Sequence, residues 1–88
     1  MNSEPTWRVG VVFSETEDRT RADAILELAG ERFHGWGQAK RSPGDPSVPM
    51  IGEELAAARA LSDLSHQLMQ AAADRIDSHE GHPVQLRG

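Results

Sequence analysis

Apolar and polar residues alternate one by one near the start of the chain. Between Trp7 and Ser14, every odd-numbered position holds a tryptophan, a valine or a phenylalanine. Aromatic and β-branched residues at every second position are typical of a β-strand. The sequence therefore predicts a first strand over residues 7–14. A polar stretch, residues 1–6, precedes it, and we expect this stretch to be frayed.

Two more alternating runs follow, at residues 22–29 and 32–41, after a polar connection at residues 15–20. The alanines, leucines and glutamate of the earlier run would also suit a helix. Its shortness and the glycine that follows favour a strand that turns back tightly into the next one. We therefore predict a β-hairpin with a two-residue turn, at either Ala29-Gly30 or Gly30-Glu31.

Such a turn fixes which residues of the two strands lie side by side. It places even-numbered positions of the earlier strand beside odd-numbered positions of the later one, so that Leu26 or Leu28 neighbours Phe33 on one face. On the other face Glu27 approaches Arg32, an attractive cross-strand pair. The patterning of both strands agrees with this register.

The period changes after residues 42–49, SPGDPSVP, which hold three of the five prolines and cannot continue a strand ladder. Apolar residues then recur at steps of three and four, which predicts an amphipathic helix from about Gly52 to Arg75 or Asp77. Glutamates 53 and 54 in its first turn suit the positive end of the helix dipole. The apolar positions of this pattern are Leu55, Ala58, Leu61, Leu64, Leu68 and Ala72.

These elements predict an α+β fold: a three-stranded antiparallel β-meander with one long C-terminal helix packed on one face, in the order β-β-β-α. We expect a single domain over residues 1–88, in which residues 78–88 form a tail. Gly35 and Gly37 share the predicted inner face of the sheet, where glycine lets another backbone approach closely. The alanine-rich side of the helix is the expected neighbour, and a bulge or loose packing is the alternative. The alanines concerned are Ala56, Ala57 and Ala60.

Composition and charge narrow the classes of function. The 88 residues include no cysteine, which excludes disulfides, thiolate metal ligands and cysteine nucleophiles. Nine basic against fourteen acidic residues give a net charge of −5, and this sign opposes generic phosphate binding. No signal-peptide pattern opens the chain and no apolar run approaches the ~18 residues of a membrane span, so we expect a cytoplasmic protein. A core this small would gain from a second layer supplied by oligomerisation.

Motifs for catalysis are missing from the sequence. The segment Gly35-Trp36-Gly37 lacks the following helix and the further glycine of a phosphate-binding loop. The serines stand in no nucleophile-elbow context. We therefore expect neither an enzyme nor a cofactor.

The sheet face that one helix cannot cover is the best candidate for a functional surface. Val12, Ile25 and Trp36 occupy its predicted centre, and a tryptophan in an apolar patch with a charged rim is typical of an interface centre. The alternative is a singly exposed aromatic ring shielded by neighbouring side-chain stems. The rim consists of Arg8, Asp23, Glu27, Arg32, His34, Gln38 and Lys40. The predicted interface residues are Val12, Ile25, Arg32, His34, Trp36 and Lys40.

Two other kinds of binding use residues of the same chain. Trp36 and His34 could stack nucleic-acid bases, with basic residues of the rim close by for phosphate, although the acidic rim residues and the net charge oppose this. His79 and His82 have the chemistry of metal ligands, but a structural zinc site needs four ligands and no third is identifiable. We treat RNA binding as the alternative function and metal binding as a remote one.

Four stretches of the sequence together resemble a family of small actinobacterial proteins of unknown function. These stretches are DRTRADA at 18–24, GWGQAKR at 35–41, IGEELAAARALSDL at 51–64 and HPVQL at 82–86. The resemblance implies a fold like that of double-stranded RNA-binding domains (dsRBD-like) and similar to ribosome hibernation-promoting factors. It also implies a tendency to dimerise and a link with dormancy or stress in mycobacteria. It carries over no catalytic residues, and it implies that the HPVQL end is docked, where composition alone indicates disorder.

The chain departs from true double-stranded RNA binders at two places. Those domains have an additional N-terminal helix and a lysine cluster where their last helix begins, which contacts phosphates. This chain has the polar residues 1–6 and the acidic pair Glu53-Glu54 instead. The sequence therefore predicts a non-enzymatic, homodimeric interaction domain, with a role in stress or dormancy through the ribosome or another protein partner.

Overall fold

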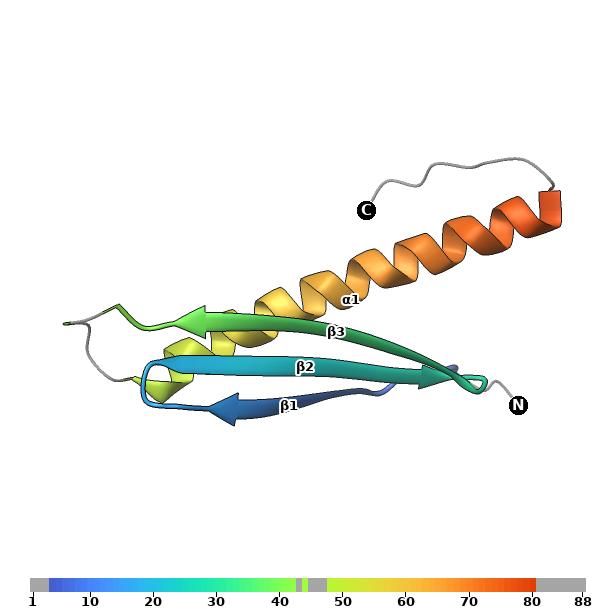
Figure 1. Ribbon diagram of the computed structural model, residues 1–88. Helices are drawn as coiled ribbons and strands as arrows, with labels where there is room; N and C mark the ends of the chain where they lie inside the picture. Colours follow the sequence, from blue (N-terminus) through green and yellow to red (C-terminus); the bar gives the residue numbers. More distant parts are fainter. Residues whose placement is uncertain (1–3, 43, 45–47, 81–88) are drawn as a thin grey trace.

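The computed structural model describes residues 4–42, 44 and 48–80. In this part of the chain, three strands form one antiparallel sheet in the order β1-β2-β3, and one helix follows (Figure 1). Strand β1 spans Val9–Glu15, β2 spans Arg19–Leu28, β3 spans Glu31–Lys40, and helix α1 spans Pro49–Glu80. The α+β class and the β-β-β-α order predicted from the sequence are confirmed.

The β2–β3 hairpin turns at Ala29-Gly30. Both residues have positive φ, 49° and 80°, as the central residues of a type I′ turn require. The register pairs Leu26 with Phe33 and Glu27 with Arg32. The first of the two predicted turns and the predicted register are therefore both confirmed.

The connection between β1 and β2 is shorter than predicted. The N–H of Thr16 donates to the carbonyl of Arg19 at 2.8 Å, so that β2 begins at Arg19 rather than at Ala22. Its first residues are polar, yet they alternate: Thr20 is buried while Arg19 and Arg21 are exposed. A buried threonine gave no hydrophobic signal, which is why the sequence pattern hid this end of the strand.

Helix α1 packs over β2 and β3 through its small residues. A Cβ atom on Gly35 would lie 2.5 Å from the carbonyl oxygen of Ala60, and one on Gly37 would lie 2.6 Å from the amide nitrogen of Ala60. The prediction that these glycines admit the alanine-rich side of the helix is therefore confirmed. The buried core consists of Ala22, Ala24, Leu26, Phe33, Ala39, Ala56, Ala60 and Leu64.

The predicted apolar stripe of the helix is wrong in part. Of its six positions only Leu64 is buried, while Leu55, Ala58 and Leu61 are exposed. Close approach to the two strand glycines requires small side chains, so a narrow row at four-residue steps faces the sheet in place of the leucine row. The helix also begins three residues earlier than predicted and continues to Glu80. Residues 78–80 of the predicted tail are therefore helical, and the remainder of that tail, with the expected docking of HPVQL, lies outside the described residues.

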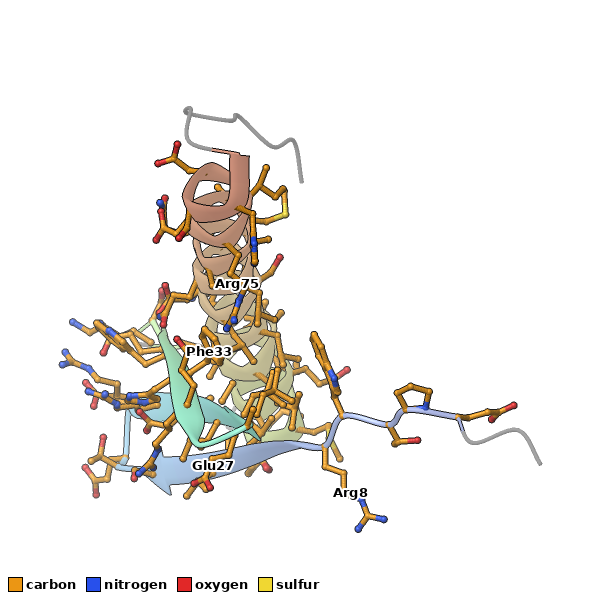
Figure 2. The ribbon with its side chains drawn as sticks, turned by 90° about the vertical axis from the view of Figure 1, so that its right-hand side faces the viewer. Arg8, Glu27, Phe33 and Arg75 are labelled. Carbon is orange, nitrogen blue, oxygen red and sulfur yellow. The ribbon has the colours of Figure 1, made fainter. Side chains whose placement is uncertain are left out.

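The helix covers one side of the sheet unevenly. Its packing is against β3 and β2, and its C-terminal end projects beyond the sheet (Figure 1). In Figure 2, Phe33 lies between the sheet and the helix, whereas Arg8, next to β1, lies clear of the helix. On the inner face of β1, Val9 and Phe13 are 42% and 37% exposed, so the described part of the helix leaves this face largely uncovered.

The free edge of β3 is hydrogen-bonded by side chains from α1. Asp63 accepts the N–H of Trp36 at 2.9 Å. Gln67 donates to the carbonyl of His34 at 2.6 Å and Arg59 donates to that of Gln38 at 2.7 Å. Residues at four-residue steps on one flank of the helix thus run along this strand edge.

Candidate functional site: the open sheet face

The face of the sheet opposite the helix brings four of the six predicted interface residues together. Val12 pairs with Asp23, and Asp23 pairs with Trp36, which forms one row across the three strands. The neighbouring row contains Ile25 and His34. Trp36 is 46% exposed and Val12 is 57% exposed, so this row presents apolar surface to the solvent. We call this surface, with Val12, Asp23, Ile25, His34 and Trp36, the open face.

A compact ionic cluster holds the tryptophan. The guanidinium carbon of Arg21 lies 4.6 Å from the centroid of the Trp36 ring, within the range of a cation–π contact. Arg21 also donates to the carboxylate of Asp23 at 3.0 Å, and Nε2 of His34 donates to the same carboxylate at 2.6 Å. Asp23 therefore orients two side chains, one on each side of it along the open face.

The same contacts shift two pKa values. The hydrogen bond from Arg21, and after it the bond from His34, lowers the pKa of Asp23 below its ordinary 3.8. The pKa of Arg21 is raised in turn, chiefly by its hydrogen bond to Asp23. The Arg21–Asp23 pair consequently stays ionised at neutral pH, and the charge of Asp23 largely balances that of Arg21.

The predicted interface residues do not all lie at the centre. Val12, Ile25, His34 and Trp36 are neighbours, whereas the other two lie at opposite ends of β3. Arg32 is beside Glu27 and Lys40 is beside Arg19. They form a rim rather than part of the central cluster.

Arg21 is the central residue that sequence reasoning missed. The predicted second strand began at Ala22 and the predicted connection ended at Thr20, so Arg21 belonged to neither and was given no face. Its odd number places it on the same face as Asp23, and this parity was the available signal once the strand was extended by three residues.

Residues with other candidate roles lie elsewhere. His79 is exposed in the last turn of the helix, and His82 lies outside the described residues. Among the described residues, no group of three or more histidine, aspartate or glutamate side chains is placed to hold a metal ion. No described helix is long and apolar enough to span a lipid bilayer.

A hollow of about 330 Å³ lies at one end of the sheet. It is bordered by the β1–β2 turn, the end of β3 and the first two turns of α1. The mixture of acidic, basic and aliphatic residues in its walls does not select one chemistry.

Comparison with known proteins identifies the family. The model of the Rv2632c-like family matches residues 5–85. The chain belongs to the Rv2632c-like family. Uncharacterized protein Rv2632c of Mycobacterium tuberculosis (strain H37Rv) is 43% identical over 79 residues, which cover 90% of this chain and 85% of that protein. Uncharacterized protein Mb1767 of Mycobacterium bovis is 38% identical over 80 residues, covering 91% of this chain and 85% of that protein.

A solved member of the Rv2632c-like family has the same fold. The crystal structure of Rv2632c aligns with a TM-score of 0.84 and 40% identity, and the alignment covers 93% of this chain and 98% of that one. The expectation of an actinobacterial family of unknown function thus agrees with the mycobacterial relatives. The sheet that carries the open face therefore belongs to an architecture that this chain shares with Rv2632c.

Proposed function

We propose that this Rv2632c-like chain is a non-enzymatic, cytoplasmic interaction domain that acts as a homodimer and binds a protein partner through its open face. The observation that carries the proposal is the exposed Trp36 held by Arg21. Tryptophan and arginine are the residues most often found at energetic centres of protein interfaces. Here both are held in place before binding, which lowers the entropy that association costs.

The charge arrangement favours a protein partner over RNA. Asp23 balances the charge of Arg21, which weakens the positive field that phosphate binding needs. The guanidinium also occupies space above the indole ring, where a base would stack. An interface of apolar centre and paired charges suits another protein surface better.

The family resemblance of the sequence implies a fold similar to that of ribosome hibernation-promoting factors, and this expectation suggests where to look for the partner. We propose a role in stress or dormancy physiology through a protein component of the ribosome. The decisive measurement is co-sedimentation of the purified chain with ribosomes from starved mycobacterial cells, for wild type and Trp36→Ala, across a series of salt concentrations.

We expect wild-type chain to sediment with ribosomes and Trp36→Ala to lose at least about tenfold in affinity, as for a central interface residue. Met50→Ala, at another exposed apolar residue, is the matched control and should bind like wild type. A steep fall of wild-type affinity with salt would instead indicate RNA contact. Absence of sedimentation at low salt would contradict ribosome association, and equal binding by Trp36→Ala would contradict the open face as the site.

A further inference from the structure

The two edges of the sheet differ. Strand β3 has its edge covered by Asp63, Gln67 and Arg59 of the helix. Strand β1 is the other edge, and within residues 4–42, 44 and 48–80 no side chain is recorded as hydrogen-bonded to its free main chain. Uncovered edges are where another strand can add.

The free main-chain groups of β1 belong to its odd-numbered residues. The bond from Thr16 N–H to the Arg19 carbonyl sets the alternation of the antiparallel ladder, in which every second residue bonds to the neighbouring strand. Even-numbered residues of β1 therefore bond to β2, and the N–H and C=O groups of Val9, Val11 and Phe13 point outwards.

The same odd-numbered residues carry apolar side chains on the helix side of the sheet. Val9 shares this face with Leu26 of the core. Helical spacing places Leu61 on the flank of α1 opposite to Arg59, Asp63 and Gln67, which bond β3, and this is the flank on the β1 side of the sheet. The exposed fractions are 60% for Trp7, 42% for Val9, 37% for Phe13 and 42% for Leu61.

We propose that β1 pairs antiparallel with β1 of a second copy of this chain, which makes a continuous six-stranded sheet. The inference specifies the geometry of the homodimer proposed above and rests on it. The two-fold axis passes beside Gly10, perpendicular to the sheet, so that both helices lie on one face. Such a contact is isologous, because each copy uses the same strand.

The segment from Trp7 to Phe13, which contains most of β1 and the two residues before it, is self-complementary about Gly10. Read in either direction, its inner row is aromatic, valine, valine, aromatic: Trp7, Val9, Val11 and Phe13. Pairing about Gly10 sets Trp7 against the partner's Phe13 and Val9 against the partner's Val11. Aromatic and β-branched cross-strand pairs are among the favourable ones. On the outer face Arg8 meets the partner's Val12, so no like charges face each other.

The surface available fits a dimer of modest size. Aromatic side chains present roughly 150–250 Å² each and aliphatic ones less, so the four exposed fractions leave on the order of 350 Å² of apolar surface per chain. Two copies would bury about 700 Å² of this apolar surface. The paired edges of the two β1 strands, and the partly exposed Val11 and Leu68, would bury additional area. The total approaches the lower end of the roughly 1,200–2,000 Å² of stable interfaces.

A proline at position 9 tests the pairing. Proline is tolerated on an edge strand where its missing N–H would face outwards, so Val9→Pro should fold but lose a hydrogen bond to the second copy. Val9→Thr keeps the N–H and the β-branched shape and is the matched control. Light scattering should give twice the chain mass of 9.6 kDa for wild type and Val9→Thr, and a single chain mass for Val9→Pro. Far-ultraviolet circular dichroism checks that the proline variant is folded.

Single cysteines provide a second test, since the chain has none of its own. Gly10 faces itself across the axis at a non-hydrogen-bonded pair, where Cα atoms are about 4.5 Å apart, a separation that a disulfide spans. A Cβ atom on Gly10 has nothing within 4 Å. Gly10→Cys should therefore give a covalent dimer on mild oxidation, whereas Ser14→Cys on the same outer face should not. More efficient cross-linking by Ser14→Cys than by Gly10→Cys would overturn this register.

The open face gives the comparison that separates the two proposals. If wild type and Trp36→Ala are dimers while Val9→Pro is a monomer, β1 pairing stands. If Val9→Pro is dimeric, or if Gly10→Cys stays uncross-linked while wild type is a dimer, β1 pairing fails and the proposed homodimer survives through another surface. A wild type that is monomeric at all concentrations overturns the homodimer itself, and β1 pairing with it.

Discussion

At the scale of single residues, Gly35 decides how closely the helix approaches the sheet. A Cβ atom at this position would meet main-chain atoms of Ala60 and Leu64, which cannot move aside without shifting the helix. We predict that Gly35→Ala lowers the free energy of unfolding by about 3 kcal/mol, the cost of overpacking a close contact. Urea denaturation followed by circular dichroism measures this loss.

Gly10 provides the control for that substitution. It lies in the same sheet, but nothing is within 4 Å of the position that its Cβ would take. Gly10→Ala should therefore leave stability within about 0.5 kcal/mol of wild type, as for surface substitutions in general. Equal losses for the two alanine variants would show that strand glycines act through backbone flexibility rather than through close packing.

The residues of the open face show what residue-level patterning can and cannot reveal. Parity along each strand was enough to place Val12, Ile25 and Trp36 together, because side chains alternate between faces. It could not show that Asp23 bonds both Arg21 and His34, since rotamers decide which neighbours meet. Arg21 was missed for a different reason, the misjudged start of its strand.

At the scale of elements, the β2–β3 hairpin contains a strained residue. Ala29 has a φ of 49°, in the left-handed region that costs a side-chain-bearing residue roughly 1 kcal/mol. Asparagine tolerates this region far better and is favoured before glycine in type I′ turns. We predict that Ala29→Asn raises the melting temperature by about 4 °C, measured by differential scanning calorimetry.

Gly30→Ala is the opposing variant for this turn. Its φ of 80° suits glycine, so alanine there should lower stability by about 1 kcal/mol. If Ala29→Asn melted below wild type, the positive φ would not be a source of strain in this hairpin.

The existence and order of the elements followed from the sequence, but the face of the helix did not. Alternating apolar and polar residues marked the strands, and apolar residues at steps of three and four marked the helix. Only residues 22–29 suited both kinds of element. The helix face depends on Gly35 and Gly37, which make small residues a better fit than leucines. This preference arises from tertiary packing, and the hydrophobic pattern of the helix alone favours the larger side chains.

At the scale of the whole molecule, the ionised carboxylate of Asp23 on the open face makes the stability of the fold depend on pH. The folded state lowers the pKa of Asp23 below 3.8, so its contribution is complete above that value and is lost as the pH falls through the folded pKa. We predict that Asp23→Asn is less stable than wild type at pH 7. The difference in stability between wild type and Asp23→Asn should narrow steadily as the pH falls below 3.8. Urea midpoints measured between pH 7 and pH 2 follow this change.

Glu27→Gln is the matched control for acid stability. Glu27 is on the same strand and face, but no hydrogen bond to its side chain is recorded among the described residues. Its stability difference from wild type should change little over the same pH range. A constant gap between Asp23→Asn and wild type down to pH 2 would mean that the ionised carboxylate does not stabilise the fold.

The bonds that cover the edge of β3 have a consequence for the order of synthesis. They join residues 21, 27 and 33 positions apart in the sequence, and in each case the helix residue comes later. During translation all three strands therefore leave the ribosome before Arg59, Asp63 and Gln67 do. The nascent sheet has two edges open to other chains, and translation of the helix reduces them to one.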